Sequence, residues 1–307
     1  MRQAEVVVVG SINIDLVFAI THLPAVGETV GGASFSLQPG GKGANQAVAA
    51  ARMGVSVAII GCVGDDDYGR RLRALLEQDG VDCSQVQTVP GPSGCAGIFV
   101  DCRGENLIAV APGANGKLTP ETVKKSIASI ADARVLLVQL ESPLPAVRAA
   151  LAQAREAGVM TILDPAPAME LGPDIFSLLD YITPNAREAS KLTGIDVHCW
   201  STAAQAAREL RRQGVKTVLV TMGKLGAFYS SSVGEVRIAA PRVDAVDATG
   251  AGDAFNGALA AALVRGAAPD QAADIAAAAG ALASASRGAQ PSLPRLEQVA
   301  KVVNLPW

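Results

Sequence analysis

The sequence predicts an α/β fold: a doubly wound, mostly parallel central sheet flanked by helices, with a small antiparallel β-lid. Three observations support this prediction. Short apolar runs recur along the chain, helical stretches separate them, and two regions break the alternation with strand-like segments only. Strands that alternate with helices at this spacing are typical of a parallel sheet covered by helices on both faces.

Six apolar runs of strand length are the expected members of the central sheet. They are rich in Val, Ile and Leu, and they lack the apolar–polar alternation of a strand with one solvated face. These runs cover residues 6–10, 55–64, 134–140, 159–164, 181–184 and 216–223.

Helices are expected between these runs and at the end of the chain. Four stretches each end at a Gly, which is common just after the last helical residue. They cover residues 43–54, 67–80, 143–158 and 202–214, and two alanine-rich helices follow at 251–266 and 270–286.

Residues 13–40 and about 93–112 interrupt the alternation. They contain the strand-like segments "IDLVFAI", "GGASFSL", "GCAGIFVD" and "NLIAVAP", with no helix between them. We expect these segments to form the small antiparallel sheet that covers the main sheet as a lid. Because no linker rich in Pro, Gly or Ser separates two halves, we expect one domain over residues 1–307.

The composition indicates a globular enzyme-sized chain rather than a disordered or basic one. Half of the 307 residues are hydrophobic and the formal net charge is −3, which excludes the disordered class. No Lys/Arg cluster larger than a pair occurs, so we expect no nucleic-acid partner. We also expect no membrane span, because no apolar run reaches 18 residues. A cytoplasmic protein is the default expectation.

The cysteines and histidines do not have the spacing of a zinc site. Five cysteines form no CxxC pair, and the only histidines are His22 and His198. We interpret the cysteines as small buried hydrophobic residues, and an odd count suits a reducing compartment. The chemistry is therefore expected to depend on carboxylates, Lys and backbone groups.

The stretch "DATGAGDAFNG" at 247–257 is the first candidate site. Gly250, Ala251 and Gly252 precede Asp253 at the start of a predicted helix. The amino end of a helix offers unpaired N–H groups and a positive dipole end, and glycines let an anion approach them. The stretch therefore predicts an anion hole with Asp253 at its edge. The alternative is that Asp253 only caps the helix.

Polar residues also gather where the early strands are expected to end. These residues are Asn13, Asp15, Lys42, Asn45 and Glu141. Ligands of open α/β sheets bind just beyond the carboxyl ends of the strands. Asn and Asp side chains supply the donors and acceptors that a polyhydroxylated ligand needs. The alternative for each residue alone is turn chemistry.

Two later turns carry further candidates, and two known fingerprints are missing. Asn185 and Glu188 can hold a phosphate or a metal-bound water, or they can form a capping box. Residues 221–227 form either a hairpin or a phosphate cradle. "GAGDAF" lacks the third Gly of a dinucleotide fingerprint, and Gly43 stands where a Walker A loop needs Ser or Thr. These absences disfavour a nicotinamide enzyme and a P-loop enzyme.

Taken together, these motifs resemble the ribokinase family of carbohydrate kinases over nearly the whole chain. They include "GSINID", "QLESP", "DPAPA", "ITPNAREAS" and "VTMGKLGA". The signatures "GGKGANQAVAAARMG" and "DATGAGDAFNG" are specific when they occur together in this order. The resemblance implies a ribokinase-like fold and transfer of the γ-phosphoryl group of ATP to the 5-hydroxyl of D-ribose.

The resemblance also implies a role for each candidate residue. Asp253 would be the general base, and Gly250, Ala251 and Gly252 would form the anion hole. The residues expected to hold the sugar are Asn13, Asp15, Gly41, Lys42, Gly43, Asn45, Glu141 and Asp253 itself. Asn185 and Glu188 would lie near the phosphates and Mg²⁺, and the nucleotide would contact Thr221, Gly223, Lys224, Gly226 and Gly252.

One further feature follows from the resemblance. A monovalent cation such as K⁺ would bind beside the anion hole, at Asp247, Thr249, Ala283, Ser286, Gly288 and Ser292. Pairing of two lids into a homodimer is also expected, because an isolated small sheet needs another surface to cover it. In addition, the helix dipole should keep Asp253 ionised, which makes it a weak base.

The sequence departs from relatives at Ala248, where many have Thr, and in the alanine-rich helix at 270–286, where some have His or Asn beside the adenine. Kinases for 2-deoxyribose, fructose, nucleosides or pseudouridine remain alternatives. Asn13 favours ribose, because it can pair with a 2-hydroxyl, whereas an apolar residue there would favour deoxyribose. A sugar-binding regulator without catalysis is a third class, disfavoured by the intact Asp253 and anion hole.

Overall fold

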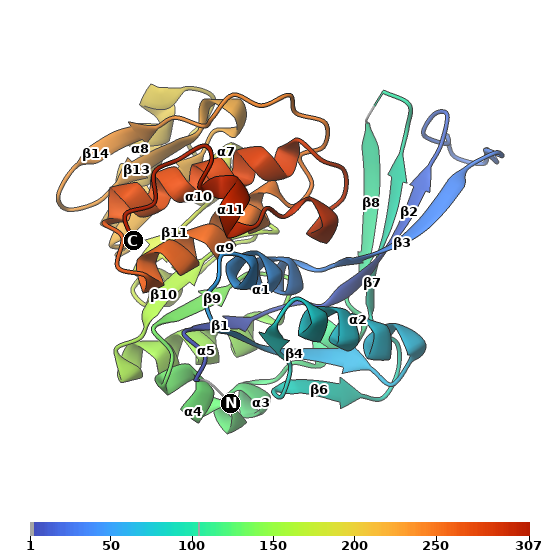
Figure 1. Cartoon of the computed structure of the whole chain (residues 1–307), viewed down its shortest axis with the longest axis horizontal. Coiled ribbons are helices and arrows are strands. Elements are labelled where there is room, and N and C mark those ends of the chain that lie inside the picture. Colours follow the sequence, from blue (N-terminus) through green and yellow to red (C-terminus); the bar gives the residue numbers. More distant parts are fainter. Residues whose placement is uncertain (1–2, 104) are drawn as a thin grey trace.

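The main sheet has ten strands, as predicted mostly parallel, with helices on both faces (Figure 1). The computed structural model describes residues 3–103 and 105–307. In chain order the strands of this sheet are β1 (Val6–Val9), β4 (Val57–Gly64), β5 (Val81–Asp82), β6 (Val86–Val89), β9 (Val135–Val138), β10 (Met160–Leu163), β11 (Tyr181–Ile182), β12 (Thr217–Thr221), β13 (Ala227–Ser230) and β14 (Glu235–Ile238). The order across the sheet is β14-β13-β12-β11-β10-β9-β1-β4-β5, and β6 also pairs with β4. Only β12–β13 and β13–β14 pair antiparallel.

All six predicted runs are strands, and four short strands were not predicted. β5 has only two residues, and β14 is exposed at the sheet edge with the sequence EVRI. Neither carries enough consecutive apolar residues to resemble a buried strand. β1 lies at the centre, between β4 and β9, and all four of its valines are buried.

The two faces of the main sheet carry separate hydrophobic cores. Val6 and Val8 pack with one core, and Val7 and Val9 pack with the other, because successive side chains of a strand point to opposite faces. On the first face lie α1 (Lys42–Arg52), α2 (Asp67–Gln78), α9 (Ala251–Val264), α10 (Pro269–Ser284) and α11 (Leu296–Val299). On the second lie α3 (Pro120–Lys125), α4 (Ile127–Ala131), α5 (Leu144–Ala157), α6 (Pro173–Phe176), α7 (Ala186–Thr193) and α8 (Trp200–Arg212).

Helix α9 packs very closely against α1, and small residues permit this approach. A Cβ at Gly257 would come within 2.4 Å of Ala49 Cβ and 2.8 Å of Gln46 O. Almost every residue of α9 after its first turn is buried. The contact holds the beginnings of α1 and α9 side by side, where the candidate site lies.

A second sheet of four strands stands beside the main sheet (Figure 1). Its strands, in the order β3-β2-β7-β8, are β2 (Asn13–Ala19), β3 (Ser34–Gly40), β7 (Gly94–Val100) and β8 (Asn106–Ala111). They fall inside the two ranges expected to form the lid; residue 104 lies outside the described residues. The outer pairs are antiparallel, as expected, and the central pair β2–β7 is parallel. Within the described residues, no helix is long and apolar enough to cross a bilayer.

Candidate active site

The carboxyl ends of four parallel strands meet the amino ends of two helices at one edge of the main sheet. Asn13, Glu141, Asp164 and Asn185 follow β1, β9, β10 and β11 within four residues. Lys42 begins α1, and α9 begins close to it. Residues far apart in the sequence therefore reach one place, which is where open α/β sheets bind ligands.

Asp253 lies in the first turn of α9 and is oriented by two amides of α1. Asn45 Nδ2 donates to Asp253 Oδ2 at 2.8 Å, and Gln46 Nε2 donates to Oδ1 at 3.0 Å. The N-cap of α9 is Gly250, with no side-chain cap bond. The interpretation of Asp253 as a simple helix cap is therefore wrong.

Burial raises the pKa of Asp253, although Lys42, Asn45 and Gln46 lower it. Only 5% of Asp253 is exposed, and a carboxylate loses favourable hydration when it is buried. Desolvation therefore opposes the effect expected of the helix dipole, which was to keep Asp253 ionised and weakly basic. The raised pKa makes Asp253 a better proton acceptor.

A second buried carboxylate, Asp164, shares the same amide. Gln46 Nε2 donates to Asp164 Oδ2 at 2.8 Å, and Gln46 Oε1 accepts from Gln139 Nε2 at 2.6 Å. Burial raises the pKa of Asp164 to about 8; Lys42 opposes the shift, and Glu188 and Asp253 add to it. Asp164 was not among the predicted site residues.

We expect Asp164→Asn to become increasingly more stable than the original chain as the pH rises from about 4 to 8. Burial raises the pKa of Asp164 to about 8 in the folded state, so the folded state holds this proton more tightly than the unfolded state does. The resulting contribution to the free energy of unfolding is complete below the unfolded pKa and is lost as the pH rises through about 8. Asn keeps an acceptor for Gln46 and cannot ionise. Urea unfolding across this pH range should show the gap widen by at least about 1.4 kcal/mol, one pKa unit. A constant gap would contradict this prediction.

The amino end of α9 is an open cradle. Gly250 has φ +79°, and a Cβ on Gly252 would find nothing within 4 Å. Ala251 N donates to Ala248 O at 3.2 Å, whereas Gly252 N and Asp253 N have no partner among the residues that the structure describes. Free N–H groups and a positive dipole end fit a phosphate.

Glycines bring the beginning of α1 against the loop after β1. A Cβ on Gly43 would lie 2.6 Å from Ser11 N, and Gly41 has φ +88° with Asn13 N only 2.7 Å from its Cβ position. Glu141 Oε2 accepts from Ser11 Oγ at 2.6 Å and from Lys42 N at 3.1 Å. Glu141 thus anchors both segments.

Asn13 and Asp15 lie two apart on β2, so their side chains share one face. Both are buried, and Asp15 packs against Gly40, whose Cβ position is 2.2 Å from Asp15 Oδ2. Burial raises the pKa of Asp15 to about 7, with Glu141 and Asp253 adding to it. Burial would lower the pKa of Lys42, but the carboxylates around it, led by Asp253, raise it overall. The ammonium group of Lys42 is therefore stabilised by the acids around it.

Asn185 and Glu188 form the capping box of α7. Asn185 Oδ1 accepts from Glu188 N at 2.9 Å, and Glu188 Oε2 accepts from Asn185 N at 2.8 Å. Burial raises the pKa of Glu188 despite these bonds and Lys42. Glu188 Oε1 has no hydrogen bond within the described part of the chain, so a hard cation or its water has one carboxylate oxygen available.

Residues 221–227 are a hairpin connection, one of the two alternatives left open by the sequence. β12 and β13 pair antiparallel through the short 3₁₀ turn η2 (Gly223–Leu225), which contains Lys224. A Cβ on Gly226, at φ +104°, would lie 1.9 Å from Ile238 O. Thr221 also bridges to Asn185, which joins the hairpin to the α7 end of the site.

The predicted cation loops contact one another. Asp247 Oδ1 accepts from Thr249 N at 2.9 Å, and Oδ2 accepts from Gly288 N at 2.9 Å. Burial would raise the pKa of Asp247, but the hydrogen bond from Thr249 Oγ1, together with the two backbone bonds, outweighs burial and lowers the pKa overall. Ala283 O accepts from Ser286 N at 3.3 Å, and Ser292 lies in the 3₁₀ turn η3 (Gln290–Ser292) that follows. These bonds bring the loop before α9 and the turns after α10 together at Asp247.

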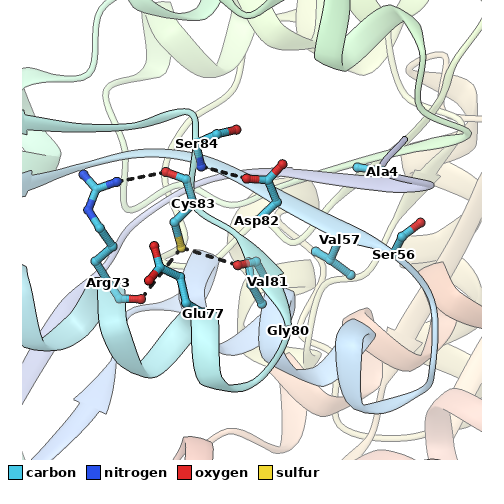
Figure 2. Close-up of a pocket in the computed structure, with 10 residues that line it drawn as sticks. All are labelled: Ala4, Ser56, Val57, Arg73, Glu77, Gly80, Val81, Asp82, Cys83 and Ser84. Atoms are coloured by element: carbon cyan, nitrogen blue, oxygen red, sulfur yellow. Dashed lines mark hydrogen bonds between the residues drawn. The ribbon is translucent and has the colours of Figure 1, made fainter. Parts of the chain in front are cut away.

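Two surface hollows lie at the opposite, amino ends of the strands. The first is lined by the beginnings of β1, β4 and β5, with Arg73 and Glu77 beside it (Figure 2). Arg73 Nη1 donates to Cys83 O at 2.9 Å, and Ser84 N donates to Asp82 Oδ1 at 2.8 Å. The second lies at the beginnings of β10, β11 and β12. Neither hollow includes a predicted site residue.

Sequence reasoning missed three buried amides and acids around the site: Gln46, Gln139 and Asp164. Asp164 directly follows β10, and Glu141 follows β9 by three residues. The rule that ligands bind beyond the carboxyl ends of strands, which indicated Glu141, could therefore also have indicated Asp164. A fourth missed residue is Asn115, in the 3₁₀ turn η1 (Gly113–Lys117), which bonds Asn13. No local signal indicates that contact.

Comparison with known proteins agrees with this geometry. The chain is similar to ribokinase of Haemophilus influenzae, with 41% identity over 95% of each chain, and to deoxyribokinase of Salmonella typhi, with 35% identity over 98% of this chain and 99% of that one. The structure of Arabidopsis thaliana ribokinase complexed with ribose and ATP matches with a TM-score of 0.91 and 32% identity, covering 98% of each chain.

The fold confirms the resemblance seen in the motifs, and the similarity extends over both sheets. The model of the pfkB family carbohydrate kinases matches residues 3–296, which include β1, the four strands of the second sheet, and α9. The chain belongs to the pfkB family of carbohydrate kinases.

Proposed function

We propose that this protein transfers the γ-phosphoryl group of ATP to the 5-hydroxyl of D-ribose, giving ribose 5-phosphate and ADP. One observation carries the proposal: the buried carboxylate of Asp253, in the first turn of α9 beside its open N–H groups, is held by Asn45 and Gln46 of α1 and is near enough to Asp15 of β2 to raise the pKa of Asp15. A base next to an anion cradle is what phosphoryl transfer to an alcohol needs. The ribokinase relatives support the choice of reaction.

Asn13 supports ribose over 2-deoxyribose. Relatives named ribokinase and deoxyribokinase are both similar to this chain, so overall identity does not choose between the sugars. Asn13 is 3% exposed, and in this proposal its amide would pair with the 2-hydroxyl of a bound ribose. A deoxy sugar would leave that amide without a partner, which is unfavourable in a buried site.

The chemical step uses residues that are already in position. Asp253 accepts the proton of the 5-hydroxyl as its oxygen bonds to the γ-phosphorus and the bond to ADP breaks. Asn45 and Gln46 hold the carboxylate, and Asn45 Oδ1, a buried acceptor without a partner among the described residues, can accept from a sugar hydroxyl. The N–H groups of Gly252 and Asp253 offset negative charge on the transferred group without reorganising.

The remaining residues are assigned to the nucleotide and the ions. Thr221, Gly223, Lys224 and Gly226 would line the nucleotide, and Glu188 with Asn185 would hold Mg²⁺ through oxygen atoms and water. Bound Mg²⁺ supplies charge neutralisation on the phosphates. K⁺ would be held by the loops joined through Asp247, where it would stabilise the beginning of α9.

We propose further that the chain acts as one unit in which the second sheet closes as a lid. The closed lid would exclude water from the phosphoryl group. The five cysteines are free thiols, which supports a reducing, cytoplasmic location. Only Cys62 and Cys83 of the five are buried, so the interpretation of all five as buried residues is wrong.

We expect the lid to pair with that of a second copy. Phe35, Phe18, Phe99 and Leu107 form a row across it; ring centroids are 5.0 Å and 5.2 Å apart, and Phe35 and Leu107 are more than half exposed. A row of exposed apolar side chains is typical of an interface. Leu107→Glu should shift a dimer toward monomer in sedimentation velocity; a monomeric original chain would contradict the pairing.

The proposed function is tested by ADP release with ribose, 2-deoxyribose, fructose and nucleosides, each in K⁺ and in Na⁺. We expect the highest kcat/KM with ribose in K⁺. A preference for 2-deoxyribose or a nucleoside would overturn the assignment of the sugar, and no ADP with any sugar would overturn the kinase assignment.

A further inference from the structure

Among the described residues, the side chain of Asn13 has one hydrogen-bond partner, Asn115, which lies 102 residues away in the chain. Asn115 Nδ2 donates to Asn13 Oδ1 at 2.6 Å, and both side chains are buried, with 3% and 2% of the residues exposed. The contact also requires Gly94, because a Cβ there would lie 2.1 Å from Asn115 Nδ2 and 2.3 Å from Asn13 Oδ1.

The orientation of Asn115 is fixed by the backbone of Ile12. Ile12 N donates to Asn115 Oδ1 at 2.9 Å, and Asn115 Nδ2 donates to Ile12 O at 3.3 Å. A backbone N–H can only donate and a carbonyl can only accept. The amide of Asn115 therefore has only one orientation that satisfies both groups, with Oδ1 toward Ile12 N and Nδ2 toward Ile12 O.

This orientation determines which end of Asn13 is free. Because Asn115 presents its N–H group, the side-chain atom of Asn13 that faces it must be the oxygen. Asn13 Nδ2 is then the exposed end: it has no partner among the described residues, and it is not one of the fully enclosed polar atoms. Asn13 thus offers a donor to the site, next to the carboxylate of Asp15, which offers an acceptor.

We propose that Asn115 is a positioning residue for sugar specificity: it fixes the Asn13 amide so that an N–H donor, and not an oxygen, faces the 2-position of the pentose. A 2-hydroxyl can accept from Asn13 and donate to an acceptor such as Asp15. A 2-deoxy sugar leaves the fixed N–H unpaired. This inference rests on the proposed function, because it assumes that Asn13 contacts the sugar.

The test is the preference for ribose, measured as the ratio of kcat/KM for ribose to kcat/KM for 2-deoxyribose. In Asn115→Leu, the amide of Asn13 loses its fixed partner, so the preference should fall about tenfold or more, as loss of a buried polar pair predicts. The fall should come from a higher KM for ribose, with kcat and the KM for ATP nearly unchanged.

A double-mutant cycle shows whether Asn115 acts through Asn13. Asn13→Leu removes the amide that reads the sugar, so adding Asn115→Leu to it should change the preference no further. Thr161→Val is the matched control for lost buried hydrogen bonds: Thr161 Oγ1 donates to Leu178 O at 2.7 Å at the amino end of β10, away from the site. It should leave the preference unchanged.

Each outcome bears on one claim. An unchanged preference in Asn115→Leu, an equal loss in Thr161→Val, or a further loss in the double variant would overturn the role of Asn115. If Asn115→Leu does not fold, Asn115→Ser, whose hydroxyl is too short to bond both Ile12 and Asn13, is measured by the same criteria. Absence of pentose phosphorylation by the original chain would instead overturn the proposed function.

Discussion

Asp253→Ala is expected to lower kcat for ribose phosphorylation by about 10²–10⁴-fold, the usual contribution of a general base. The alanine removes the carboxylate that two amides of α1 hold, Asn45 at 2.8 Å and Gln46 at 3.0 Å. The free N–H groups at the start of α9 remain. We therefore expect the dissociation constant for ATP to stay within about threefold of the original value, and ribose still to bind with the loss of one hydrogen bond from its 5-hydroxyl, since the main contribution of Asp253 is made in the transition state.

Calorimetric titration with each substrate separates this result from a folding defect. Because burial raises the pKa of Asp253, removing this carboxylate should offset part of the stability lost with the hydrogen bonds from Asn45 and Gln46, so we expect no large loss of stability. Turnover like that of the original chain would show that another group accepts the proton.

Gly252→Ala should raise stability and lower activity at once. A Cβ at this position finds open space, and Ala is favoured over Gly in a helix, so unfolding should cost about 0.5 kcal/mol more. The same methyl group occupies the cradle where the terminal phosphate would lie. Loss of such donor contacts typically lowers kcat by about 10²-fold. Chemical denaturation and initial rates measure the two effects.

Gly257→Ala is the matched control, with the same chemical change in the same helix. Its Cβ would meet Ala49 Cβ at 2.4 Å and Gln46 O at 2.8 Å, so it should destabilise the protein by about 1–3 kcal/mol. If Gly252→Ala retained full activity, the amino end of α9 would not be the phosphate site.

Much of the fold could be predicted because its main strands are buried on both faces. β1 and β9 are continuous apolar runs, and in a chain where helices alternate with such runs, each run is typical of a buried parallel strand. β5 and β14 could not be predicted in this way, because one has two residues and the other is an exposed edge. The parallel pairing of β2 with β7 joins two segments that leave the main sheet at separate points in the chain. No local sequence pattern predicts which of their strands pair or in which direction.

The site was predictable where its residues sit in motifs. Asp253, Lys42 and Asn45 lie beside glycines whose spacing indicates a close backbone approach. Gln46 lies in the same motif, but its partners Asp164 and Asp253 are 118 and 207 residues away. Its role became visible only when α1, α9 and β10 were brought together.

The most direct test of the proposed site is a crystal structure with ribose and a non-hydrolysable ATP analogue. We predict that the terminal phosphate accepts from the N–H groups of Gly252 and Asp253, and that the 5-hydroxyl lies within hydrogen-bond distance of the Asp253 carboxylate. A nucleotide bound at the amino ends of the strands, in the hollow beside Arg73 (Figure 2), would contradict this assignment.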